Sequence, residues 1–327
     1  MDWVGEAGFL VIEGWLERQQ SRVSILAIYS QKNLGFYINW GKAMAIKVEK
    51  LSDACGAEIK GVDLREKLSD ADKEAIEDAF HENVVVVFRD QDLDDEDQLA
   101  FANQLGGLGE RRQSPNGHTP GGSYDTPFML VTNIKDEKTG EPIGAFGDGE
   151  MWFHHDTSYY PNPHKATLLY SVTLPSWGGQ TCFANMYKAY ENLPEELRTR
   201  LEGRKVLQIH DYKRRERIDI YNTDISGMLQ CEQPLFVTHP VTGRKALYIS
   251  RLMSARIEGL APQENEDVLN QLFDIAEDPS IVFEHEWRLG DLVMWDNYAS
   301  IHKRKDFPRE EPRLMRRLTL AGYGPLN

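Results

Sequence analysis

The chain has 327 residues, and its 41% hydrophobic and 27% charged residues are typical of globular proteins, which excludes a disordered chain. The formal net charge of -15 excludes a nucleic-acid partner, because the summed field would repel phosphates, although a local basic pocket could still bind a small anion. No apolar run approaches the length that spans a bilayer, so no membrane partner is expected.

Residues 1–43 show no sustained helical or strand period, whereas a regular pattern begins near Met44. We therefore expect an N-terminal extension over residues 1–43, whose role the sequence does not give, and one main domain over residues 44–327. The extension also lacks the basic start, apolar stretch and cleavage site of a signal peptide.

The main domain begins with two predicted helices around a buried strand. Ser69 is placed to cap the first helix, and the strand covers residues 84–88, an apolar run rich in valine. Asp94 is placed to cap the second helix. Residues 109–149 are rich in turn residues, so they predict a long loop that forms a lid, with one strand at 128–131.

Many short strands follow, separated by turn residues, and helical patterns at 187–201 and 264–276 interrupt them. The predicted strands cover residues 166–172, 180–184, 245–249, 281–287, 291–295 and 314–320. Many strands with few helices predict a mainly β (α+β) fold, namely a double-stranded β-helix, or jelly roll, with flanking helices. The three cysteines lack paired spacing, which favours a cytoplasmic protein, and homo-oligomerisation is left open.

The candidate chemistry begins at His154 and Asp156, which lie two residues apart. If this segment is extended, both side chains leave the same face and His155 points away. One imidazole and one carboxylate, completed by a distant histidine, form a facial triad that leaves metal positions open. Nitrogen and oxygen ligands without thiolate suit ferrous iron better than structural zinc.

His302 is the candidate third ligand, because it follows a strand-like run, residues 290–297, that ends in polar residues. Each signal alone is weak. A lone histidine after a strand is more often structural, and a His-any-Asp triplet arises easily by chance among nine histidines.

Strand alternation after a turn-rich segment puts Arg313 and Arg317 on one face. A planar guanidinium suits a fixed carboxylate. The alternative is a solvated run of charges, which composition alone favours.

Together these motifs resemble the taurine dioxygenase and dichlorophenoxyacetate dioxygenase family of iron- and 2-oxoglutarate-dependent enzymes, over about residues 46–325. The resemblance implies that His154, Asp156 and His302 hold Fe(2+). It also implies that the enzyme consumes 2-oxoglutarate and O2, releases succinate and CO2, and hydroxylates a small substrate. Because related halogenases have a small residue at the position of Asp156, oxygenation is expected.

The resemblance also assigns cosubstrate and substrate residues. Arg313 lies eleven positions beyond His302, so it would bind the far carboxylate of 2-oxoglutarate. The segment 175–181, Pro-Ser-Trp-Gly-Gly-Gln-Thr, implies that Thr181 shares that carboxylate. Arg317 matches a family position that can contact an anionic substrate.

Two further residues are substrate-binding candidates. Glu150 stands where taurine dioxygenase has an asparagine, so taurine is not expected. The alternative for Arg317 is an internal pair with Glu150 or another carboxylate, which would leave the pocket neutral and suited to an uncharged substrate. Tyr159 could line a pocket that tolerates aromatic substrates, although a buried core position suits it as well.

Two alternative functions remain open at this point. The same chemistry could end in cleavage of a C-O, C-S or C-N bond. A non-catalytic jelly-roll binding protein would need broken metal and cosubstrate motifs, and these motifs are intact here.

Overall fold

The structure is a computed structural model that describes residues 9–15, 22–30, 33–40, 46–111, 126–147, 150–210 and 216–327. The chain divides into two compact units, Met1–Lys47 and Val48–Asn327. The first unit contains an antiparallel sheet in the order β1-β2-β3, formed by Phe9–Trp15, Arg22–Ser30 and Asn33–Trp40. The sequence did not predict these strands, because their aromatic and β-branched residues do not alternate cleanly with polar ones.

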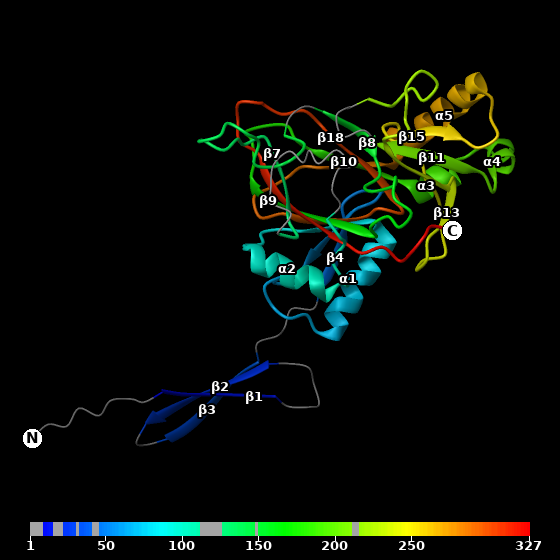
Figure 1. The fold of residues 1–327 in the computed structure, drawn as a ribbon. Helices are drawn as coiled ribbons and strands as arrows, with labels where there is room; N and C mark the ends of the chain where they lie inside the picture. The colour runs from blue at the N-terminus through cyan, green and yellow to red at the C-terminus, as the bar shows by residue number, and fades with distance from the viewer. Residues whose placement is uncertain are drawn as a thin grey trace, which may run out of the picture. The chain divides into compact units, whose positions relative to one another are not determined.

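The second unit is built on two sheets that face each other (Figure 1). One sheet has seven strands in the order β4-β5-β6-β17-β9-β19-β7, and the other has four in the order β16-β10-β18-β8. Trp295 of the larger sheet packs on Phe183 of the smaller one, with ring centroids 5.4 Å apart. The strands are β4 (Lys47–Lys50), β5 (Ala57–Lys60), β6 (Val85–Phe88), β7 (Met129–Thr132), β8 (Met151–His154), β9 (Ala166–Thr173), β10 (Thr181–Asn185), β16 (Val282–His285), β17 (Leu292–Asp296), β18 (Ser300–Arg304) and β19 (Leu314–Leu320).

Two smaller sheets, β12-β11-β15 and β13-β14, and the helices complete this unit. Their bounds are β11 (Lys205–His210), β12 (Leu229–Pro234), β13 (Phe236–Thr238), β14 (Lys245–Leu247), β15 (Ser254–Ile257), α1 (Asp70–Asn83), α2 (Asp95–Gln104), α3 (Met186–Glu191), α4 (Glu195–Leu201), α5 (Pro262–Ala276) and η1 (Pro279–Ile281). Among the described residues, no helix is long and apolar enough to cross a bilayer. The predicted mainly β fold with few helices is confirmed.

Helix α1 and strand β6 form as their sequences predict. The Ser69 hydroxyl accepts a hydrogen bond from the Asp72 amide at 3.1 Å and so caps the helix. The helix ends at Val84, whose φ of 68° turns the chain into β6. Because α1 packs against β5, β6 and β17, all four residues of β6 are buried.

The predicted helix over residues 187–201 is two helices, α3 and α4. The break falls at Pro194, which cannot donate a backbone hydrogen bond and disfavours helix in the residue before it. In the predicted lid, β7 forms close to the expected strand and pairs with β19. Residues 112–125 and 148–149 of the lid lie outside the described residues.

His302 lies within a strand rather than after one. The Asp296 carboxylate accepts hydrogen bonds from the amides of Tyr298 and Ala299, at 2.8 and 3.2 Å, and this contact stabilises a tight turn. The turn reverses the chain, so that β18 begins at Ser300 and leads back beside β10.

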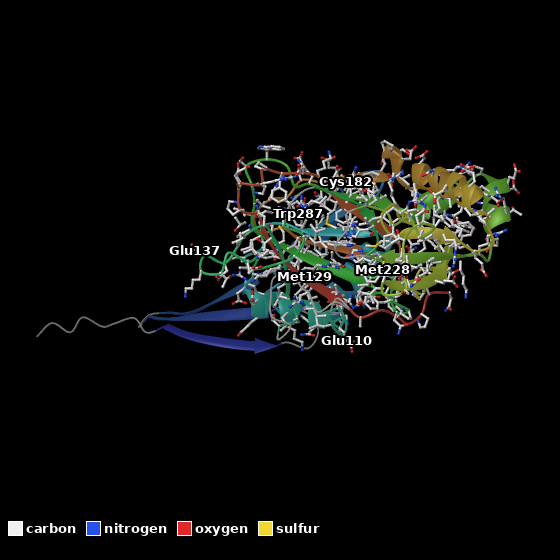
Figure 2. All side chains as sticks on the ribbon, turned by 45° about the horizontal axis from the view of Figure 1, so that its top comes forward. Glu110, Met129, Glu137, Cys182, Met228 and Trp287 are labelled. Atoms are coloured by element: carbon white, nitrogen blue, oxygen red, sulfur yellow. The ribbon has the colours of Figure 1, made fainter. Side chains whose placement is uncertain are left out.

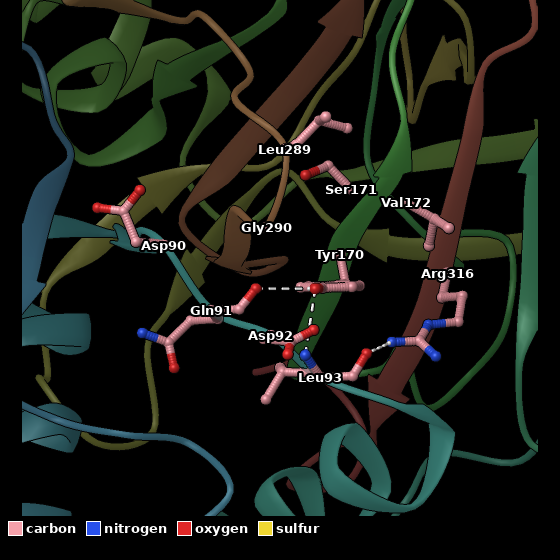
Figure 3. A pocket seen from close by; sticks show the side chains of 10 residues that line it. All are labelled: Asp90, Gln91, Asp92, Leu93, Tyr170, Ser171, Val172, Leu289, Gly290 and Arg316. Atoms are coloured by element: carbon pink, nitrogen blue, oxygen red, sulfur yellow. Dashed lines mark hydrogen bonds between the residues drawn. The ribbon is translucent and has the colours of Figure 1, made fainter.

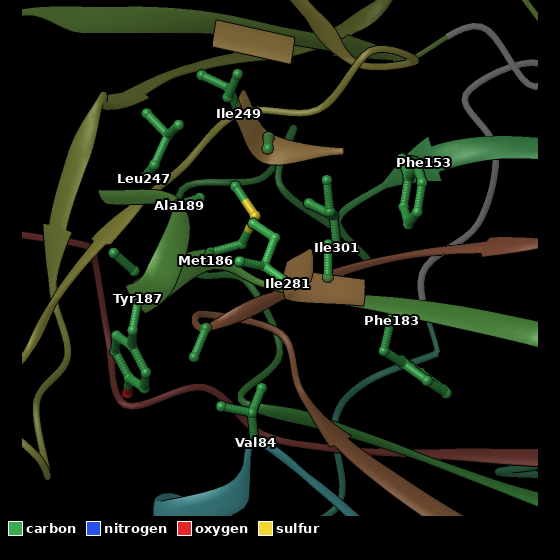
Figure 4. Packing of buried hydrophobic residues seen from close by; sticks show 14 of the residues in the cluster. Val84, Phe153, Phe183, Met186, Tyr187, Ala189, Leu247, Ile249, Ile281 and Ile301 are labelled. Carbon is green, nitrogen blue, oxygen red and sulfur yellow. The ribbon is translucent and has the colours of Figure 1, made fainter. Parts of the chain in front are cut away.

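The hydrophobic core lies between the two sheets and continues under α3 and α5. Figure 4 shows Phe183, Met186 and Ile301 in this core, and all three are fully buried. In Figure 2, side chains fill the body of this unit, while Glu137 extends from an outer loop.

We propose that residues 44–327 fold without the extension. A chain that starts at Met44 should melt within about 2 °C of the full chain, since a shift of that size corresponds to less than about 1 kcal/mol for a domain of this size. Differential scanning calorimetry of both chains measures the shift. A loss of several degrees would show that the extension stabilises the main domain.

Candidate metal centre

The structure brings His154, Asp156 and His302 together. Strands β8 and β18 pair so that His302 lies opposite His154, with ring centroids 4.2 Å apart. Asp156 follows the end of β8, just before Thr157, whose φ of 59° turns the chain. Each of the three side chains offers one ligand atom, and these atoms lie within 4.8 Å of one another.

His155 points away from this group. Its ring stacks on Tyr248 with a centroid separation of 4.1 Å, and its Nδ1 bonds the carbonyl of Asn297 at 3.0 Å. Burial lowers the pKa of His155 to about 4, so it stays neutral. It therefore belongs to the core rather than to the site.

The two candidate histidine ligands are neutral, as metal binding requires. Burial lowers the pKa of His154 and, more strongly, that of His302. Nδ1 of His154 lies 2.9 Å from the carbonyl of Trp152, so it carries the proton and leaves the Nε2 lone pair free.

Asp156 is held as a carboxylate by two neighbours. Nη2 of Arg317 and the hydroxyl of Thr167 each lie 2.7 Å from the same oxygen, Oδ2. Burial alone would raise the pKa of Asp156, but Arg317, the neighbouring imidazoles and the hydrogen bond from Thr167 outweigh it and hold the pKa well below the ordinary value. Two neutral imidazoles and one carboxylate, without thiolate, suit a divalent metal with open positions.

Arg317 pairs with Asp156 and not with Glu150. Glu150 lies 3.9 Å from Lys303 instead, and its side chain is 54% exposed. The remaining donors of Arg317 are less engaged: Nη1 contacts the sulfur of Met129 at 3.7 Å, and Nε is buried with no hydrogen-bond partner among the described residues. Arg317 therefore has donors left for a second anion.

Arg313 is a buried cation in the same interior, 2% exposed, with its guanidinium 5.6 Å from the ring of Phe307. Its Nε and Nη1 are buried, and within the described part of the chain they have no hydrogen-bond partner. Burial, and then the charge of Arg304, lower the pKa of Arg313 to about 9. A buried cation without a counter-charge is costly, so the free donors of Arg313 suit an anionic ligand.

A glycine allows the chain to pass close to the Arg313 guanidinium. Gly179 has a φ of +72°, and a Cβ there would lie 3.2 Å from Nε of Arg313. Thr181 follows two residues later, and its oxygen accepts a hydrogen bond from the indole of Trp287 at 3.0 Å. Among the described residues the Thr181 hydroxyl accepts this bond and donates none, so its proton is available to a ligand. The backbone of Arg313 is also held in place, because its N–H donates a hydrogen bond to the side-chain carbonyl of Asn133 at 2.9 Å.

Tyr159 is buried in a small cluster with Leu252 and Met253, and its ring stacks on His210 at 4.9 Å. The cluster adjoins β8, because the Leu252 amide bonds the carbonyl of Phe153 at 3.2 Å. The side chain therefore packs as a core residue beside the strand that carries His154.

A second group of possible metal ligands consists of His81, His239 and Asp296. The sequence did not predict this group, because its members lie far apart in the chain and form no motif. Nδ1 of His239 accepts bonds from the amides of Val241 and Thr242, both at 3.2 Å, so its proton lies on Nε2. Nε2 faces Asp296 at 2.9 Å. Nε2 makes no hydrogen bond of good geometry within the described residues, so His239 and Asp296 form a close polar contact, with Nδ1 of His81 4.0 Å from the same carboxylate.

A surface cavity of about 450 Å³ lies elsewhere, between β9, β19 and the segments before α2 and β17 (Figure 3). Its polar groups bond one another: the Tyr170 hydroxyl donates to the Gln91 carbonyl at 2.8 Å, and Arg316 donates to the Leu93 carbonyl. None of the predicted site residues lines it.

The chain is similar in sequence and in fold to several known proteins. The chain is 33% identical to pentalenolactone F synthase of Streptomyces avermitilis, over 81% of this chain and 90% of that protein. It is 32% identical to the (S)-phenoxypropionate/alpha-ketoglutarate-dioxygenase of Sphingobium herbicidovorans, over 85% and 96%. The solved structure of AAD-2 with Mn(II) and N-oxalylglycine superposes with a TM-score of 0.68 and 29% identity, covering 87% of this chain and all of that one.

The profile of one protein family, described as taurine catabolism dioxygenase TauD, TfdA family, matches residues 47–319. This match spans both facing sheets, from β4 to β19, and includes every candidate residue of the site. The chain therefore belongs to the TauD and TfdA family of dioxygenases.

Proposed function

We propose that the protein is an Fe(II)- and 2-oxoglutarate-dependent dioxygenase with a jelly-roll fold. It would use O2 to hydroxylate a small anionic organic substrate, with release of succinate and CO2. The observation that carries the proposal is the pairing, inside one pair of sheets, of a two-His-one-carboxylate group with the buried, unpaired cation of Arg313. The first needs a metal, and the second needs an anion of fixed position.

In this proposal His154, Asp156 and His302 hold the iron, which supplies the redox chemistry of O2 when bound. Arg313 and Thr181 fix the far carboxylate of 2-oxoglutarate, so the keto-acid end points at the metal. Aromatic rings help to exclude water, since Trp295 lies 4.8 Å from the His302 ring. This protein's own task is thus positioning and exclusion of side reactions.

Arg317 would meet the anionic group of the substrate with the donors that Asp156 leaves unused. One guanidinium would then bridge a metal ligand and the substrate, which sets the distance between the metal and the carbon to be oxidised. Glu150 would act at the edge of the substrate pocket, and Tyr159, which packs in the core beside β8, would form part of its wall. Glu150 is exposed, so it suits an entrance position.

A related outcome is cleavage of a bond through an unstable hydroxylated intermediate. One relative acts on phenoxypropionate, in which an ether oxygen adjoins the carbon that bears the carboxylate. Hydroxylation of such a carbon gives a hemiketal-like product that loses the phenol. Product analysis separates this outcome from stable hydroxylation.

We also propose that the enzyme acts in the cytoplasm, as its three free cysteines suggest. Screening small carboxylates, sulfonates and aryloxy acids for succinate release, with iron and 2-oxoglutarate present, tests activity and substrate class together. Release of succinate with none of the anions, but with neutral compounds, would contradict the anionic pocket.

Asp156→Ala should abolish both iron binding and coupled succinate formation, because it removes the carboxylate of the metal site. Metal titration and a succinate assay measure the two effects. The matched control is Asp224→Ala, which removes an exposed carboxylate. Full activity of Asp156→Ala would refute the metal assignment.

Arg313→Ala should raise the apparent Michaelis constant for 2-oxoglutarate by about one to two orders of magnitude, since a buried charge-assisted contact contributes roughly 1.5 to 3 kcal/mol. Steady-state kinetics at saturating substrate measure the change. Arg309→Ala, at an exposed position of the preceding turn, serves as control. An unchanged constant for Arg313→Ala means that the cosubstrate lies elsewhere.

Arg317→Ala should slow turnover of an acid substrate far more than turnover of its neutral amide, because only the acid is paired with the guanidinium. The comparison needs an acid found in the screen, its amide, and both enzyme forms. If the wild type prefers the amide, or if the substitution slows both compounds alike, Arg317 does not read the charge of the substrate.

A further inference from the structure

Asp156 receives a hydrogen-bond chain that the proposed mechanism has not yet used. The chain begins at the amide of Asn297, whose Nδ2 donates to the hydroxyl of Thr167 at 3.0 Å, and Thr167 donates to Oδ2 of Asp156 at 2.7 Å. A carboxylate can only accept, so the single proton of the Thr167 hydroxyl goes to Asp156, and the hydroxyl oxygen accepts from Asn297. The direction of the chain is therefore fixed.

Both supporting residues are fully buried and anchored to the backbone. The backbone N–H of Asn297 donates to the carbonyl of Lys165 at 3.0 Å. The backbone carbonyl of Asn297 accepts from Nδ1 of His155. Asn297 follows the end of β17, and its backbone thus connects this strand to Lys165, at the start of β9, and to His155, the residue before Asp156. Thr167 lies on β9, directly opposite Trp295 of β17.

The chain ends on one carboxylate oxygen, which Arg317 also contacts. Oδ2 therefore has two strong donors, while Oδ1 has no role in these contacts. A carboxylate held in this way cannot turn about its own axis to present both oxygens to a metal. A carboxylate that binds through one oxygen leaves the remaining metal positions for other ligands.

We propose that Thr167 and Asn297 are positioning residues, which hold Asp156 through Oδ2 so that Oδ1 is the oxygen offered to the metal. This inference rests on the proposed metal role of Asp156. It also gives a function to the Trp-Asp-Asn end of β17: Asp296 stabilises the turn into β18, and Asn297 orients the carboxylate ligand.

The test compares Thr167→Val and Thr167→Ala, which remove the hydroxyl, with Thr167→Ser, which retains it. Calorimetric titration with Mn²⁺ measures metal affinity, and the visible charge-transfer band of the anaerobic enzyme with Fe(II) and 2-oxoglutarate reports the geometry of the metal. The melting temperature of each metal-free variant is measured beside them, to separate binding from folding.

Thr167→Val and Thr167→Ala should weaken Mn²⁺ binding by about 10- to 100-fold and shift the band, since partners of metal ligands typically have effects of this size. Thr167→Ser should keep the wild-type affinity and band. Using two apolar variants guards against misfolding of either one. Wild-type affinity and an unshifted band in a folded apolar variant would overturn the positioning role.

Asp156→Ala, measured in the same titration, distinguishes this inference from the proposed function. If that variant binds Mn²⁺ as tightly as the wild type, the metal site itself is wrong. If it loses Mn²⁺ while the apolar Thr167 variants keep it, the metal site stands and the positioning role is refuted.

Discussion

The register between β8 and β18 is the constraint on which the candidate site depends, because it sets His154 directly opposite His302. Side chains alternate between the faces of a sheet, so a slip of one residue would send one imidazole outward and bring Lys303 toward the interior. Two features hold the register. The turn stabilised by Asp296 fixes where β18 begins, and pairing with β10 fixes it from the other side.

The interior between the sheets contains charged side chains in apolar surroundings, and these surroundings change the energy of each charge. Phe183 and Trp295 surround His302 and lower the effective dielectric constant around it. In such surroundings, the ion pair between Arg317 and Asp156 is stronger than it would be in water, and it keeps the carboxylate ionised. The same surroundings make the cation of Arg313 costly, since its Nε and Nη1 have no hydrogen-bond partner in the described part of the chain.

Local patterns in the sequence predicted much of the fold: β19 has the expected bounds, and Ser69 caps α1 as expected. The strands of the first unit were missed because they lack alternation. For the site, the sequence could name candidate residues from their order and spacing, but not the contact between Arg317 and Asp156. That contact joins strand β19 to a loop after β8, and no local period carries such information. The roles of these residues stay proposals.

If Arg313 binds 2-oxoglutarate as proposed, its burial also couples the stability of the folded chain to the supply of that cosubstrate. In that case the folded state would bind the dicarboxylate and the unfolded chain would not, because only folding buries the Arg313 guanidinium. The free energy of unfolding then rises with the logarithm of the dicarboxylate concentration, by about 2.7 kcal/mol at one hundred times the dissociation constant. A cell poor in this molecule would hold a less stable enzyme, so the supply of cosubstrate would set the lifetime of the protein as well as its rate.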